Sequence, residues 1–271
     1  MKKSIHKSYE DIWFPISDDF PWIADLGCGF TLFLFNENVD YSKVEDFLKS
    51  SVVSSIYYND LTYLEYVDAY FHGVRSEDDF LANQYKQYLK VFGGNHFIEH
   101  GKDKYGRNYL LIHCGSNGIF PYLYERNKWQ VKRIIECCYN YASENRKGII
   151  KQFCRYLDIP FNEWNIWDQK HTFMLNDGLI MGYSESKDEG NIFTGGPFQK
   201  TLLIRTNEDC YIRHGVEELP YIKLFDYLRY SKEDFRNYGR SFVSLSKYDF
   251  SGFEILNTFK PKITERPRNA H

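Results

Sequence analysis

The chain lacks any apolar run that approaches the ~20 residues a membrane-spanning helix requires. Its basic start, residues 1–14, contains no apolar stretch like that of a signal peptide. We also find no internal repeat, no low-complexity tract and no linker rich in Pro or Ser. These absences predict a cytoplasmic protein with no membrane partner, organised as a single domain over residues 1–271.

Cysteine and surplus positive charge are also scarce. The six cysteines are scattered through 271 residues, which is a poor pattern for a disulfide scaffold, so we expect reduced thiols. The formal net charge of −3 argues against a protein coated in positive charge, but it leaves a local basic groove open. What the chain does have is 43% hydrophobic residues, enough for a substantial core.

Apolar periodicity and turn residues predict a mixture of helices and strands without a regular βαβ alternation. Helices are predicted over 41–50, 78–92, 127–158 and 217–230. Strands are predicted over 22–26, 30–35, 95–100, 108–115, 171–175, 178–183, 200–206, 210–215 and 253–260, with a tight glycine turn at 27–29. This mixture predicts an α+β fold of layered β-sheets flanked by helices.

Several metal-competent side chains stand at predicted strand ends or turns, from which a rigid sheet can aim them into one cleft. They are Asp25, Cys28, His96, His113, His171 and His214. A thiolate, a carboxylate and several imidazoles suit a transition metal. The small neighbours Gly27 and Gly29 suit a thiolate that binds two ions. No short-range spacing matches a zinc finger, so the fold would have to assemble the site, and structural histidines stay the alternative.

Three segments resemble, in the same order, motifs of the RtcB family of GTP- and manganese-dependent RNA ligases. Residues 25–29 read DLGCG, residues 93–99 read GGNHFIE and residues 113–116 read HCGS. Weaker similarity follows at His171-Thr172, 193–205, Arg213-His214-Gly215 and 253–263. The resemblance spans about residues 20–263 in a compressed form. It implies an RtcB-like fold, with one catalytic domain over 1–271.

The resemblance also implies two manganese ions and GTP as cofactors. Asp25, Cys28 and His96 would bind one ion, and Cys28, His113 and His171 would bind the second, with the Cys28 thiolate bridging. Asn95 and Glu99 would contact the guanylate, and Lys262 would read its base. Lys200 is a candidate for phosphate contact. His214 would be the nucleophile that forms a histidine–GMP adduct.

The activity implied is the joining of an RNA 3′-phosphate or 2′,3′-cyclic phosphate to a 5′-hydroxyl, as in RNA repair and tRNA processing. The partners would be RNA with broken ends and GTP, and the need for an activating protein is left open. Two metals, a neutral imidazole nucleophile and phosphoryl transfer are chemically compatible, because charge on phosphate oxygens must be neutralised.

The sequence departs from the family in its basic motifs. The segment 181–188 reads MGYSESKD where the family has RKGA, and Glu217-Glu218 follow His214-Gly215 where the family has an arginine. Asn117 replaces another arginine. Two alternatives therefore stay open: a protein that binds RNA or nucleotides without ligating, and a metal-dependent cyclic-phosphate phosphoesterase.

Basic residues elsewhere could compensate for the missing motifs. The predicted helix over 127–158 carries Lys128, Lys132, Arg133, Arg146, Lys147, Lys151 and Arg155. This set could form a groove for an RNA backbone, or it could be a solvated helix face.

Overall fold

A computed structural model describes residues 5–10, 12–15, 21–22, 26–52, 89–91, 96–116, 128–214, 222–223 and 245–267. The helices are α1 (Tyr41–Ser51) and α4 (Lys128–Leu157), with short 3-10 helices at Glu163–Asn165 and Leu245–Lys247. The strands are β1 (Ile5–His6), β2 (Trp13–Pro15), β3 (Pro21–Trp22), β4 (Leu26–Phe35), β5 (Phe97–Asp103), β6 (Asn108–Ser116), β7 (Ile166–Lys170), β8 (Thr172–Leu175), β9 (Gly178–Met181), β10 (Tyr183–Glu185), β11 (Asn191–Thr194), β12 (Thr201–Arg205), β13 (Tyr211–Arg213), β14 (Ile222–Lys223) and β15 (Glu254–Glu265). The described part is thus a mixed α/β structure, mostly strand, and its strands form four sheets.

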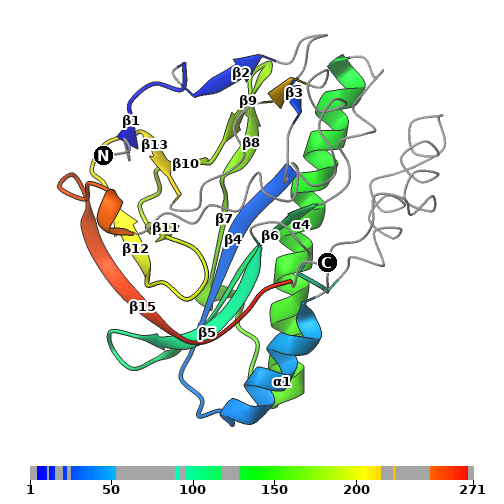
Figure 1. Ribbon diagram of the computed structural model, residues 1–271, viewed down its shortest axis with the longest axis vertical. Coiled ribbons are helices and arrows are strands. Elements are labelled where there is room, and N and C mark those ends of the chain that lie inside the picture. The colour runs from blue at the N-terminus through cyan, green and yellow to red at the C-terminus, as the bar shows by residue number, and fades with distance from the viewer. Residues whose placement is uncertain are drawn as a thin grey trace.

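The seven-stranded sheet, here called the large sheet, has the order β11-β12-β15-β5-β6-β4-β7 and pairs antiparallel throughout. It curls strongly (Figure 1). Its edge strands are linked by the Gln169 side chain of β7, which accepts from Ile192 N at 2.6 Å and donates to Ile192 O at 3.1 Å in β11. One side-chain amide thus closes the curl with strand-like hydrogen bonds.

Curling gives the large sheet an inner and an outer face. The inner face holds one apolar cluster to which every strand contributes, with Phe30, Phe97, Tyr109, Trp167, Ile192, Leu203 and Phe259 as representatives of the seven. Alternation along β4 then assigns Phe33 and Phe35 to the outer face. There they pack with apolar residues of α1 and α4, such as Phe47 and Phe153. Figure 1 shows both helices on this outer side.

Most of the sequence-based assignments within the described residues are confirmed. Helix α1 begins as expected, where the Asp40 side chain accepts from Ser42 N at 2.9 Å and so caps the first turn. The strands and the long helix α4 fall close to the predicted ranges. The predicted Asn-Asp-Gly turn joins β8 to β9, and Asn176 has the positive φ of 54° that such turns favour. The helix predicted over 78–92 lies almost wholly outside the described residues.

Two assignments are wrong. Gly27-Cys28-Gly29 does not form a turn between strands, because β4 runs continuously from Leu26 to Phe35 with a bulge between Leu26 and Gly29. A bulge absorbs one residue and redirects the strand, so glycines there do not have to reverse the chain. Within the helix predicted over 217–230, residues Ile222–Lys223 instead form β14, which pairs with β3. Pro220 just before them disfavours a continuous helix.

No helix among the described residues is long and apolar enough to cross a membrane.

His100 gives the outer-face core a measurable pH dependence. Its ring is buried beside Phe35, Tyr41 and Phe153, and neither ring nitrogen has a hydrogen-bond partner among the described residues. Burial, with nearby Lys262 and Lys102, lowers the pKa of His100 from 6.5 to about 4. The folded state therefore binds this proton less readily than the unfolded state, and stability falls as the pH drops from 6.5 towards 4.

We expect His100→Phe to remove this loss of folding stability at acid pH. The loss amounts to about 3 kcal/mol, since each pKa unit is worth 1.36 kcal/mol. Urea unfolding at pH 4.5 and 7.5 checks the effect. The variant should gain stability relative to wild type at the lower pH, and an equal difference at both pH values would contradict the account.

Candidate metal centre

Cys28 lies within the bulge of β4, between two glycines that other parts of the backbone approach closely. Gly27 has φ 73°, and a Cβ there would lie 2.4 Å from the backbone oxygen of Cys138 in α4. Gly29 is equally confined, since its Cβ would lie 2.4 Å from Gln169 O in β7. The flanking glycines therefore allow a helix and a strand to approach the backbone, a reason that the sequence did not reveal.

The thiol meets two imidazoles from distant parts of the chain. Cys28 Sγ lies 3.1 Å from His113 Nε2, and His113 Nε2 lies 3.1 Å from His171 Nε2. The three ligand atoms all lie within 4.8 Å of one another, and the three side chains are buried. We call Cys28, His113 and His171 the Cys–His cluster. It lies at one end of the inner face, where Phe30 stacks on the His113 ring with centroids 4.4 Å apart.

Two further histidines adjoin the Cys–His cluster. His96 Nε2 lies 3.5 Å from Cys28 Sγ. The His214 ring lies against the His171 ring, with centroids 3.9 Å apart and planes inclined by 31°. Both side chains are buried. Of the six metal or nucleophile candidates, five are thus brought together, and Asp25 lies outside the described residues.

A chain of backbone hydrogen bonds positions His171 and His214. His171 N donates to Cys28 O at 3.1 Å, Gly182 N donates to His171 O at 2.7 Å, and His214 N donates to Gly182 O at 3.1 Å. The end of β7, the start of β10 and the end of β13 are therefore tied to β4. Sequence spacing cannot reveal this arrangement, because it depends on which strands become neighbours.

The donor set of the Cys–His cluster fits a metal ion. Thiolate and imidazole are the ligands that zinc and other transition metals prefer, and three protein ligands leave positions open for substrate or water. The three side chains present could therefore hold such an ion. Its burial beneath Phe30 and Phe97 would also exclude bulk water from the ligands.

Glu99, predicted to contact the guanylate, lies inside the large sheet. It is fully buried on the inner face, where Oε1 accepts from Tyr109 Oη at 3.0 Å and from Thr201 Oγ1 at 3.3 Å. No side-chain cation bonds to it among the described residues. Burial raises the pKa of Glu99 from 4.5 to about 8, although hydrogen bonding from nearby hydroxyl groups opposes the shift.

Among the remaining predicted contacts, Lys262 lies away from the Cys–His cluster. Lys262 lies on the outer side of the large sheet, where its Nζ donates to Tyr41 Oη at 3.0 Å and stands 4.6 Å from the Tyr41 ring centre. Lys200 is exposed just before β12. Asn95 lies outside the described residues.

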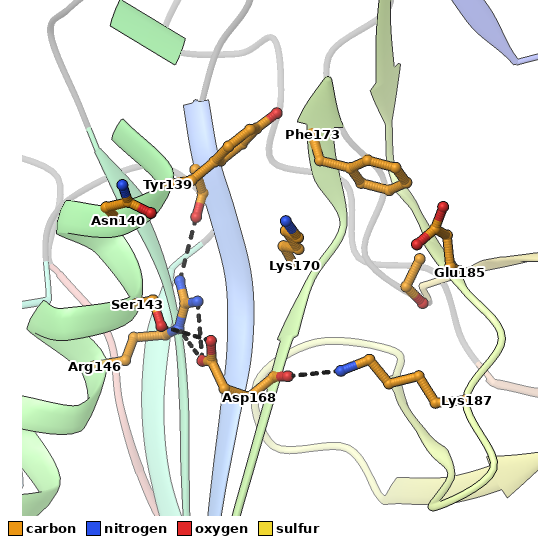
Figure 2. Close-up of a pocket in the computed structure, with 11 residues that line it drawn as sticks. Tyr139, Asn140, Ser143, Arg146, Asp168, Lys170, Phe173, Glu185 and Lys187 are labelled. Carbon is orange, nitrogen blue, oxygen red and sulfur yellow. Dashed lines mark hydrogen bonds and ion pairs between the residues drawn. The ribbon is translucent and has the colours of Figure 1, made fainter. Parts of the chain in front are cut away.

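A pocket of about 200 Å³ opens on the α4 side of β4 and β7 (Figure 2). It is lined by Gly27, Tyr139, Asn140, Ser143, Arg146, Asp168, Lys170, Phe173, Ser184, Glu185 and Lys187. Lys187 Nζ donates to the Asp168 carbonyl at 3.0 Å. The sequence did not single out this pocket, because its polar residues come from three separate segments, 139–146, 168–170 and 184–187.

Arg146 differs from its neighbours in the predicted basic face of α4. It is fully buried and bonds to Asp168, so it cannot be part of a groove that contacts RNA. Lys132 pairs with Asp177, and Lys147 Nζ lies 3.6 Å from Glu144. These ion pairs indicate that Lys132 and Lys147 belong to a solvated helix face.

Comparison with known proteins returned no relative: no protein-family model matches the chain, and neither a curated protein nor a solved structure matches it. The resemblance to the RtcB family accordingly stays a prediction from the three motifs. What the chain itself establishes is a buried cysteine–histidine group that could hold a metal ion.

Proposed function

We propose that this chain is a metal-dependent phosphoryl-transfer enzyme that joins broken RNA ends with GTP, using His214 as the nucleophile. The observation that carries the proposal is the contact of the His214 ring with His171 of the Cys–His cluster. A reactive imidazole beside ligands for a cation is the arrangement that phosphoryl transfer to histidine needs, because the cation neutralises phosphate charge.

The chain's own residues divide into two roles. Cys28, His113 and His171 would hold one ion, and His96 with Asp25 would complete a second site that shares the Cys28 thiolate. Manganese bound there would neutralise charge on the transferring phosphate. Neutral imidazole is a competent nucleophile near pH 7, so His214 needs no strong base beside it.

The proposed reaction has three steps. A His214 nitrogen attacks the α-phosphorus of GTP, a P–N bond forms and pyrophosphate leaves. An oxygen of the RNA 3′-phosphate then takes the guanylate and releases His214. A 5′-hydroxyl attacks that activated phosphate, the new phosphodiester forms and GMP leaves. A cyclic end needs prior hydrolysis by water.

Incubation with GTP labelled at the α-phosphate, in the presence of manganese, should give a covalently tagged protein. His214→Ala should lose the tag, because it removes the imidazole that lies 3.9 Å from the His171 ring. His100→Phe is the matched control, since it removes a buried histidine from the opposite face of the sheet and should keep the tag. A tag retained by His214→Ala, or an untagged wild type, would contradict the proposal.

The position of Lys262 favours a second candidate, a protein that binds metal and RNA ends without ligating them. Lys262 bonds to Tyr41 on the outer side of the large sheet. In that position it does not serve the base-reading role that the resemblance implies. A broken hairpin with cyclic-phosphate and 5′-hydroxyl ends separates the candidates. Ligation supports the enzyme, retention of the hairpin without reaction supports the binder, and opening of the ring without joining supports a phosphoesterase.

A further inference from the structure

The guanidinium of Arg146 links α4 to the backbone on both sides of the Cys–His cluster. Its Nη1 donates to Gly27 O at 3.2 Å and to Cys114 O at 2.7 Å. Gly27 directly precedes Cys28, and Cys114 directly follows His113. One nitrogen therefore holds the two peptide groups next to two of the three ligands.

The same side chain reaches the strand that leads to the third ligand. Nη2 and Nε donate to Asp168 Oδ1 at 3.0 and 3.2 Å, and Nε also donates to Thr31 Oγ1 at 2.8 Å. Asp168 lies on β7, three residues before His171. Figure 2 shows Arg146 reaching from α4 to Asp168, with Ser143 on the same carboxylate. Strands β4, β6 and β7 thus share one buried cation.

The surroundings are shaped to admit the guanidinium. A Cβ at Gly29 would lie 3.0 Å from Arg146 Nη2, so any larger residue would crowd it. Although burial opposes it, the Arg146 charge lowers the pKa of Asp168, together with hydrogen bonds from Thr31 and Ser143. The pair is therefore ionised and held from several sides at neutral pH.

Stability alone is a weak reason for this arrangement. A buried ion pair is often replaced by well-packed apolar residues without loss of stability, because desolvating the charges offsets their attraction. The five donors of a guanidinium lie in a fixed plane, however, so one arginine can set the relative positions of several carbonyls. Lysine offers one nitrogen and cannot reach the same acceptors together.

We propose that Arg146 is a positioning residue for the metal site, fixing the relative places of Cys28, His113 and His171 through Gly27, Cys114 and Asp168. The inference rests on the metal-binding part of the proposed function and is independent of GTP or RNA chemistry. Outer contacts that orient metal ligands are typically worth about 10–100-fold in metal affinity.

The test is a Co²⁺ titration of the full chain, followed by the visible and near-ultraviolet absorption of the bound ion. Arg146→Met and Arg146→Lys should both bind Co²⁺ about 10–100-fold more weakly than wild type. Their spectra should change in the thiolate-to-cobalt band, because the sulfur no longer sits at the same place relative to the imidazoles. Phe153→Ala is the control, since it opens the core on the same helix, where Phe153 packs against Phe35 and Phe47.

Each outcome decides one point. Wild-type affinity and spectrum in Arg146→Lys would show that positive charge alone suffices and would overturn the positioning role. Equal weakening in Phe153→Ala would assign the effect to general loosening, which also overturns it. If wild type binds no Co²⁺, the metal site itself fails and the inference falls with it, whereas loss of GTP labelling with Co²⁺ binding intact affects the proposed function only. Should Arg146→Met fail to fold, Arg146→Lys alone carries the comparison.

Discussion

Cys28→Ala will weaken metal binding at the Cys–His cluster, with affinity for manganese or cobalt reduced by more than about 100-fold. Cys28 supplies the one ligand of the cluster that can carry a negative charge, and its sulfur lies 3.1 Å from the His113 nitrogen. Outer contacts around metal ligands already reach about 10–100-fold in affinity, so loss of a ligand should exceed that range. Metal analysis of protein dialysed against a limiting metal concentration measures the effect.

Cys154→Ala is the matched control. Cys154 is also a buried free cysteine, but it packs in the outer-face core, where burial, with nearby Glu37, raises its thiol pKa to about 12. Its replacement should leave metal content unchanged. Equal metal content in Cys28→Ala and wild type would mean that the bound ion lies elsewhere.

Glu99→Gln will stabilise the protein at alkaline pH. The pKa of the Glu99 carboxyl is about 8 in the folded state and 4.5 unperturbed, so the folded state holds the proton more tightly. Its contribution to stability is complete below pH 4.5 and is lost as the pH rises to 8. The shift corresponds to about 4–5 kcal/mol, since each pKa unit is worth 1.36 kcal/mol. Glutamine removes the ionisation but can still accept from Tyr109 and Thr201.

Chemical unfolding at pH 5 and 8.5 checks this prediction. The variant should match wild type at pH 5 and exceed it by several kcal/mol at pH 8.5. Glu254→Gln alters an exposed carboxylate paired with Arg205, so it should change stability by less than about 1 kcal/mol at either pH. If the stability of Glu99→Gln and of wild type changes with pH in the same way, the assignment of this pH dependence to Glu99 is contradicted.

Local sequence patterns were sufficient for most of the fold. Alternation and turn residues located β5, β6, β8, β9, β12 and β15, and helical periodicity located α1 and α4. The glycines around Cys28 predict a turn as readily as a bulge, and the choice depends on the pairing of β4 with β6 and β7. No sequence pattern predicts that Gln169 links the two edge strands, since a glutamine near the end of any strand gives the same pattern.

For the candidate site, the position of side chains at strand ends was the informative signal. It singled out Cys28, His96, His113, His171 and His214, and the fold brings these five together. It could not place Lys262, because the side of a sheet that a residue faces depends on a bulge between Pro261 and Ile263. The sequence groups Arg146 with the other cations of α4, because helical periodicity does not show which arginine meets a buried carboxylate.

The most direct measurement of the central claim is the X-ray absorption spectrum, at the manganese edge, of the manganese-loaded protein. If the thiol of Cys28 and the imidazoles of His113 and His171 bind the same ion, the fit will require one sulfur together with histidine nitrogens, and the sulfur will vanish in Cys28→Ala. A shell made only of oxygen and nitrogen atoms, unchanged in that variant, would contradict the account.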